Sequence, residues 1–194
     1  MEAMTQTLSK PKDQRLIHSG MNWQQFKLLE QSFADSPGIR LFYYGGEVEI
    51  LAVSQDHETF SRLIGILLAI YFEEKGIEFT PTGSFTQEKP GVASAQADES
   101  YCIGKPKKIP DLSIEVVFTS GNLSKLNRYR ELGVPEVWFW EDGLFTLHHL
   151  RADGYERIYT SEVLPDLDME LLTRSVVMAS TVEAMRFFRK AISE

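Results

Sequence analysis

The sequence contains a single cysteine, Cys102, among 194 residues. One cysteine excludes an internal disulfide framework and any zinc site built from cysteines. Long hydrophobic runs are also missing: the most apolar stretch, residues 63–72, has ten residues, whereas a membrane-spanning helix needs about 20. We therefore expect no membrane partner, and the lack of disulfides fits the reducing cytoplasm, where we expect this protein to act.

Positive charge is scarce, with 20 Lys and Arg against 28 Asp and Glu, a net charge of −8. This balance argues against a basic nucleic-acid coat protein or a polybasic membrane binder. One segment runs against the trend, because residues 105–130 hold only two acidic residues beside six basic ones: Lys105, Lys107, Lys108, Lys125, Arg128 and Arg130. Such a cationic strip suits phosphate contacts, although a solvated turn and helix face would give the same pattern.

The first 20 residues have no apolar core of their own. They include Lys10, Lys12 and Arg15 but no hydrophobic run, so we predict a flexible N-terminal tail over residues 1–20 and not a signal peptide. The remaining residues, 21–194, fit the usual length of one domain.

Hydrophobic periodicity predicts alternating helices and strands. Helical patterns follow Asn22, cover 56–75 and 122–132, and begin again near residue 168. Strand patterns cover residues 39–44, 47–53, 77–92, 95–103, 111–118, 137–140, 144–150 and 155–160. Segment 77–92 is predicted to contain a loop as well as a strand. The Gly45-Gly46 pair predicts a hairpin between the first two strands.

The succession of strand 111–118, helix 122–132 and strand 137–140 is typical of a βαβ unit. Its two strands should be parallel with a right-handed crossover. The segments after it read as an antiparallel pair turned at Asp153-Gly154. We therefore predict one domain of the α/β (α+β) class, in which helices flank a mixed β-sheet.

The register of two predicted strands indicates where chemistry could occur. If strands 95–103 and 111–118 form a hairpin around 104–109, Asp98 lies opposite Glu115, and directly opposed residues have Cβ atoms about 4.5–5.5 Å apart. Glu115 is flanked by apolar residues, and burying an isolated charge is costly, so it needs a sheet edge or a partner. Lys125 on the next helix is a candidate partner. Two close carboxylates also suit a hard cation such as Mg²⁺.

Several stretches around Glu115 resemble the Uma-two family of putative restriction endonucleases, a branch of the PD-(D/E)xK nuclease superfamily. These are residues 109–117 (IPDLSIEVV), Ser120, Lys125-x-x-x-Tyr129 and residues 133–138 (GVPEVW). Gly46-Glu47, followed by a strand and then His57, resembles the N-terminal signature of the family. The similarity extends over about residues 23–142.

The resemblance implies a restriction-endonuclease-like fold and metal-dependent hydrolysis of phosphodiester bonds. By position, Asp98 and Glu115 would be metal ligands for Mg²⁺ or Mn²⁺, and Lys125 would be the superfamily lysine. Glu47 would be a supporting catalytic acid, and His57 a neighbour of the site.

The sequence departs from the superfamily pattern at two points. The lysine usually lies two residues after the glutamate, where this chain has Val117, and Ala97 replaces the proline that usually precedes the aspartate. A literal Pro110-Asp111 is present, but Asp111 and Glu115 on one strand would be about 13 Å apart at ~3.3 Å per residue. Asp98 is therefore the preferred ligand.

These inferences predict a divalent-metal-dependent DNA endonuclease. The alternative is a catalytically inactive nuclease-like protein that binds nucleic acid or has a regulatory role. DNA is the expected partner, and a homodimer would supply the two sites that cutting a duplex usually needs.

Overall fold

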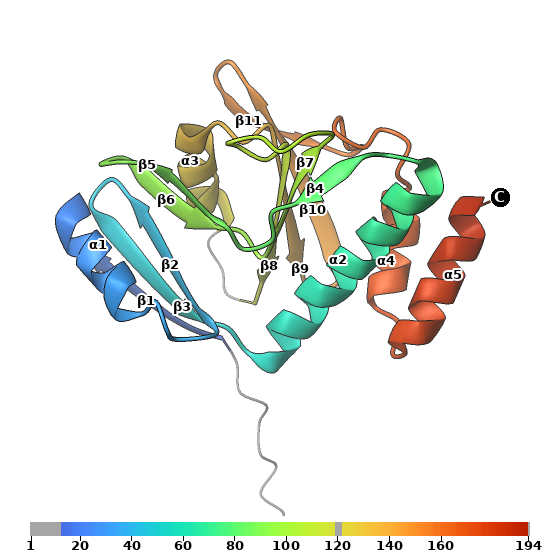
Figure 1. Cartoon of the computed structure of the whole chain (residues 1–194), viewed down its shortest axis with the longest axis horizontal. Coiled ribbons are helices and arrows are strands. Elements are labelled where there is room, and N and C mark those ends of the chain that lie inside the picture. Colours follow the sequence, from blue (N-terminus) through green and yellow to red (C-terminus); the bar gives the residue numbers. More distant parts are fainter. Residues whose placement is uncertain (1–12, 119–121, 194) are drawn as a thin grey trace, which may run out of the picture.

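The strands of this protein form two sheets in a computed structural model that describes residues 13–118 and 122–193 (Figure 1). The five-stranded sheet has the order β1 (Gln14–Ser19), β3 (Glu47–Ala52), β2 (Ile39–Tyr44), β6 (Ala93–Gln96), β5 (Thr86–Lys89). The six-stranded sheet has the order β11 (Gly154–Ile158), β10 (Leu144–Arg151), β9 (Glu136–Glu141), β8 (Leu112–Val117), β7 (Glu99–Ile103), β4 (Phe79–Pro81).

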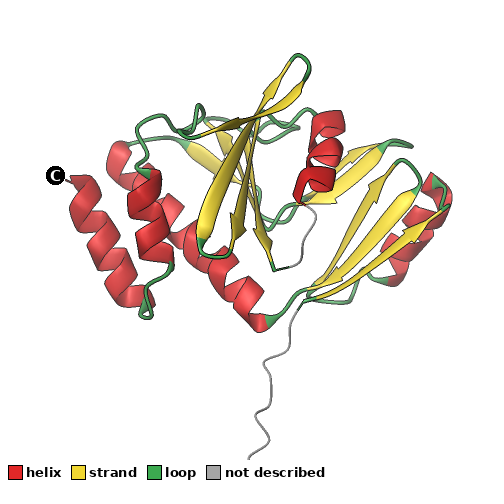
Figure 2. Cartoon of the chain, turned by 180° about the vertical axis from the view of Figure 1, so that it is seen from behind, coloured by secondary structure: helices red, strands yellow, loops and turns green. Residues whose placement is uncertain are grey.

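The helices of the described residues pack on both sheets: α1 (Trp23–Ser32), α2 (Gln55–Lys75), α3 (Asn122–Leu132), α4 (Met169–Val176) and α5 (Thr181–Ser193). Apolar residues of α2, α4 and α5 cover one face of the six-stranded sheet. On its other face, α3 packs together with apolar residues of the five-stranded sheet, whereas α1 covers the far side of that sheet. Figures 1 and 2 show α3 between the sheets, so β8 is covered on both faces.

Most of the predicted elements are confirmed. Asn22 caps α1 with a capping box, and the hairpin of β2 and β3 turns at Gly45-Gly46. α2 ends at Gly76, whose φ of 63° is left-handed. β8, α3 and β9 form the predicted parallel βαβ unit, and β10 and β11 are antiparallel. The fold is thus of the mixed α+β class, with a mixed sheet flanked by helices. Among the described helices, none is both long and apolar enough to cross a membrane.

The prediction of one continuous strand over 95–103 is wrong. This segment divides at Ala97-Asp98: β6 pairs with β2 and β5 in the five-stranded sheet, and β7 pairs with β4 and β8 in the six-stranded sheet. The chain therefore crosses from one sheet to the other at Asp98. This crossing is also why the predicted single sheet is in fact two.

The prediction of a flexible tail over residues 1–20 is also wrong for its last part. Residues 14–19 form β1, an antiparallel strand paired with β3 from Gln14↔Ala52 to Ser19↔Glu47. Main-chain pairing holds this strand in place although most of its side chains are exposed, which explains why it has no hydrophobic run. The first 12 residues of the expected tail lie outside the described residues.

Candidate active site

Glu115 lies in the middle of β8 and points to α3, because Ile114 and Val116 on either side of it pack against the opposite face. Its side chain is 1% exposed and that of Lys125 is 2% exposed, with 3.3 Å between the Lys125 Nζ and Glu115 Oε2 atoms. The hydroxyl of Tyr129 donates a hydrogen bond to Oε1 of Glu115. Lys125 and Tyr129 are four residues apart and share one face of α3, so one helix supplies both partners of the buried carboxylate.

Asp98 lies directly before β7, where the chain passes between the sheets. The β7–β8 ladder runs from Tyr101↔Leu112 to Glu99↔Ile114, which is the register expected from the sequence, and Asp98 is the next residue outside this ladder. The Asp98 N–H donates to the Ile114 carbonyl at 3.0 Å, and its Oδ2 accepts from the Val116 N–H at 2.7 Å. Asp98 is 6% exposed and Glu115 is 1% exposed, so both carboxylates are buried.

Asp111, the alternative aspartate of the Pro110-Asp111 pair, has a different role. Its carboxylate accepts a hydrogen bond from the Ile103 N–H and pairs with the Lys107 ammonium, each at 2.7 Å. These contacts hold the turn between β7 and β8, and they give a structural reason to leave Asp111 out of the site.

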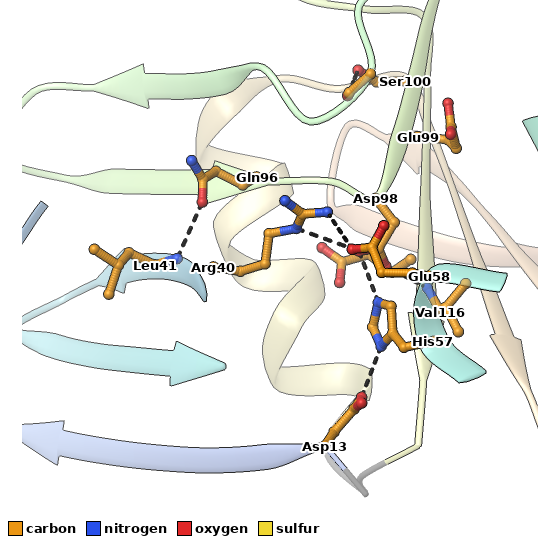
Figure 3. Close-up of polar contacts among 12 residues, drawn as sticks. Asp13, Arg40, Leu41, His57, Glu58, Gln96, Asp98, Glu99, Ser100 and Val116 are labelled. Carbon is orange, nitrogen blue, oxygen red and sulfur yellow. Dashed lines mark hydrogen bonds and ion pairs between the residues drawn. The ribbon is translucent and has the colours of Figure 1, made fainter. Parts of the chain in front are cut away.

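His57 lies in the first turn of α2 and contacts Asp98 through one ring nitrogen (Figure 3). Its Nε2 is 2.8 Å from Asp98 Oδ1, and its Nδ1 is 2.7 Å from Asp13 Oδ2. Burial alone would lower the pKa of the ring, but the bonds to both carboxylates outweigh burial and raise its pKa to about 9. The guanidinium of Arg40 also approaches Asp98, with Nε 3.7 Å from Oδ1. Asp98 therefore faces two cationic groups.

Glu47 is not joined to this cluster in the described residues. It is exposed at the first position of β3, whereas Glu49, two residues later on the same face, is 4% exposed. Arg15 Nε lies 2.8 Å from Glu49 Oε1, and Arg128 Nη1 lies 2.9 Å from Oε2. Burial opposes ionisation of Glu49, but Arg128 and Arg15 outweigh it and lower the pKa to about 2. Glu49 is thus the buried acid of β3.

The six basic residues of 105–130 do not form one exposed strip. Lys125 and Arg128 are buried against Glu115 and Glu49, and Lys107 pairs with Asp111. Lys105, Lys108 and Arg130 remain exposed. The sequence pattern overstated the cationic surface because a charge count cannot separate buried ion pairs from exposed cations.

The donor atoms of the site suit a hard divalent cation. Asp98 and Glu115 supply carboxylate oxygens from adjacent strands, and Mg²⁺ is commonly held by one or two carboxylates with water completing its shell. No group of three or more His, Cys, Asp and Glu side chains within the described residues has the spacing of a metal cage. A cation bound by Asp98 and Glu115 would therefore have to keep several of its waters and replace protein partners of these carboxylates.

A hollow lies beside this cluster, between the β2–β3 hairpin and α3. Six residues line it: Tyr44, Gly45, Glu47, Glu49, Asn127 and Arg128. It connects Glu47 with the buried Glu49–Arg128 pair, and it shows that Glu47 and Glu49 face the same space. The site as a whole is a group of buried charges between two sheets, with carboxylates balanced by a lysine, a histidine and arginines.

Sequence reasoning identified Asp98, Glu115, Lys125 and His57 of this cluster. It missed Glu49, Asp13 and the role of Tyr129. The signal for Tyr129 was its spacing of four residues from Lys125, and the signal for Glu49 was its place on the same strand face as Glu47. Asp13 had no signal in the sequence, because its contact with His57 depends on the pairing of β1.

Comparison with known proteins identifies the family of this mixed α+β chain. The family model "Uma2: Putative restriction endonuclease" matches residues 23–180. The chain belongs to this family, and the match extends beyond the residues 23–142 inferred from motifs. No curated protein matches the sequence. Among solved structures, "a putative nuclease belonging to DUF820 from Anabaena variabilis ATCC 29413" is similar, with a TM-score of 0.49 and 12% identity over 76% of this chain and 90% of that chain.

Proposed function

We propose that this protein is a divalent-metal-dependent endonuclease that hydrolyses phosphodiester bonds of DNA. Membership of the Uma2 family supports nuclease activity in general. The observation that carries the finer proposal is a pair of buried carboxylates on neighbouring segments. Asp98 accepts the N–H of Val116, the residue next to Glu115, and the Lys125 ammonium lies 3.3 Å from Glu115. Asp98 and Glu115 would hold Mg²⁺, with Mn²⁺ as a substitute.

The residues of the site have distinct tasks in this mechanism. A bound cation would polarise a phosphoryl oxygen and lower the pKa of a coordinated water. Lys125 is held by Glu115 through one of its three N–H donors, which leaves the others for a phosphate oxygen on which charge develops. Tyr129 fixes the other oxygen of Glu115. His57 and the Val116 N–H fix the two oxygens of Asp98.

The burial of Asp98, Glu115 and Lys125 favours a second candidate function. The carboxylate oxygens of Asp98 and Glu115 already have partners in the protein. A nuclease-like protein that uses this cluster only to stabilise its fold would bind nucleic acid or regulate another protein without cleaving DNA.

Thermal unfolding with Mg²⁺ or Mn²⁺ and cleavage of supercoiled plasmid distinguish the two functions. For the wild type we expect metal to stabilise the fold, by about 2.7 kcal/mol at 100 times its Kd. Glu115→Gln should abolish this stabilisation and slow cleavage about 100-fold or more, or about 2.7 kcal/mol in barrier height.

Asp111→Asn is the matched control, because it removes a carboxylate near the start of the same strand that lies outside the site. It should retain both the metal response and cleavage. A wild type without any metal response in the presence of DNA would favour the inactive protein, and a loss of metal response in Asp111→Asn but not in Glu115→Gln would contradict the assigned ligand.

A further inference from the structure

Two residues at the N-terminal end of the described chain reach the site from outside the family-matched segment 23–180. Asp13 precedes β1 and contacts His57, and Arg15 within β1 pairs with Glu49. Both contacts join residues far apart in the sequence. The site is therefore completed by a strand that the family match does not include.

The contact of Asp13 completes a chain of three side chains, Asp13–His57–Asp98 (Figure 3). The side chains of Asp13, His57 and Asp98 are 2%, 0% and 3% exposed, with nitrogen–oxygen distances of 2.7 and 2.8 Å. A buried imidazole between two carboxylates cannot turn without breaking a short polar contact. The orientation of the His57 ring is thus set from the Asp13 side.

Asp13 is itself held from two directions. Its Oδ1 accepts a hydrogen bond of 2.7 Å from the Ser54 N–H, and Ser54 caps α2 just before His57. The next residue, Gln14, begins the ladder with β3 opposite Ala52. The position of this carboxylate is therefore fixed by strand pairing and by the start of the helix that carries His57.

We propose that Asp13 is a positioning residue of the active site, which orients the Asp98 carboxylate through His57. This inference rests on the proposed function, since Asp98 is a metal ligand there. The Val116 N–H fixes Oδ2 of Asp98 and the ring of His57 fixes Oδ1. Removing the carboxylate of Asp13 frees the ring, and the free ring no longer restrains Asp98. Partners of metal ligands typically change metal affinity by about 10–100-fold when they are mutated.

The test compares Asp13→Asn with wild type in the full chain, by calorimetric titration with Mn²⁺ and Mg²⁺. The amide oxygen of Asn can still accept the Ser54 N–H, so the cap of α2 is retained while the charge beside His57 is removed. We expect the Kd for metal to rise at least about tenfold, and Asp13→Glu, which restores the charge, to recover part of the affinity.

Asp168→Asn is the matched control, because Asp168 accepts two N–H groups at the start of α4, away from the site. It should keep the wild-type Kd and nearly the wild-type stability, because Asn caps helices about as well as Asp. An unchanged Kd in Asp13→Asn, or an equal rise in the control, would overturn the positioning role.

An NMR spectrum of the His57 ring protons separates this inference from the proposed function. If wild type binds no metal, the proposed function fails, and the spectrum alone then decides whether Asp13 orients His57. A strongly deshielded Nδ1 proton that disappears in Asp13→Asn supports the contact, and an unchanged proton refutes it.

Discussion

Each buried charge of the site lies beside a charge of opposite sign. Glu115 faces Lys125, Glu49 faces Arg15 and Arg128, and Asp98 faces His57. A buried pair contributes little net stability, whereas removal of one partner leaves an uncompensated buried charge that costs about 3–5 kcal/mol. Variants of single site residues should therefore change stability and function together, and experiments must separate the two effects.

Lys125→Met separates the effect on stability from the effect on function. The proposed cation and the Lys125 ammonium both compensate the negative charge of Glu115. Without metal we expect this variant to lose about 3–5 kcal/mol of unfolding free energy. Mg²⁺ should then stabilise it more than it stabilises wild type, while plasmid cleavage falls about 100-fold because the phosphate loses its cationic contact. Thermal unfolding and cleavage assays measure both effects.

Lys107→Met is the control for that variant, because Lys107 is exposed and pairs with Asp111. Its unfolding free energy should change by less than about 1 kcal/mol. A Lys125→Met protein that cleaves DNA at the wild-type rate would show that the lysine has no part in the reaction.

Glu49 gives a prediction about pH. Its pKa is lowered from 4.5 to about 2, so its contribution to stability is present above pH 4.5 and is lost as the pH falls toward 2. A shift of this size corresponds to about 3 kcal/mol. Between pH 6 and pH 2 the unfolding free energy of wild type should fall by about that much more than that of Glu49→Gln. Urea denaturation at several pH values tests this, and parallel curves for the two proteins would contradict it.

The sequence predicted the residues of the site that lie in the local βαβ unit and its hairpin. Asp98, Glu115 and Lys125 lie within 28 residues of one another, so strand register and helix spacing were enough. Asp13 and Glu49 come together with these residues only through pairing across the five-stranded sheet. Periodicity shows that a segment is a strand but does not specify its partner.

At the scale of elements, the division of 95–103 between β6 and β7 was missed for the same reason, because periodicity does not specify which strand a segment pairs with. No glycine or proline separates the two halves. What divides them is a change of hydrogen-bonding partner, from β2 and β5 to β4 and β8. Strands that switch sheets form the corners between packed sheets. Here the corner is at Asp98, which brings a carboxylate to the space between the sheets.

The end of α2 supplies a prediction about a single element. Gly76 has a φ of 63°, and a Cβ added there would meet no atom within 4 Å. Gly76→Ala should therefore cost only the strain of the left-handed conformation, about 1–2 kcal/mol. Gly76→Asn should cost less, because Asn tolerates this region better. Chemical denaturation of the three proteins gives the comparison, and equal stability of all three would refute this account of the cap.

At the scale of the whole molecule, the net charge of −8 should limit the binding of DNA. The exposed cations of 105–130 that remain outside the described ion pairs are Lys105, Lys108 and Arg130. With these three cations, the proposed contact of Lys125 and a slope of about −0.9 for each phosphate contact, log K against log salt should be no steeper than about −4. Fluorescence anisotropy with a short duplex measures this slope, and a value near −6 would indicate contacts from other surfaces.

The pairing of β1 with β3 has a consequence for solubility. β1 is an edge strand with mostly exposed side chains, whereas the β3 beside it carries the buried Val48 and Leu51. If β1 detached, β3 would become an unpaired edge, which is the arrangement that templates strand addition between molecules. A protein shortened at its N-terminus to begin at residue 23 would therefore be more prone to aggregate than the full chain.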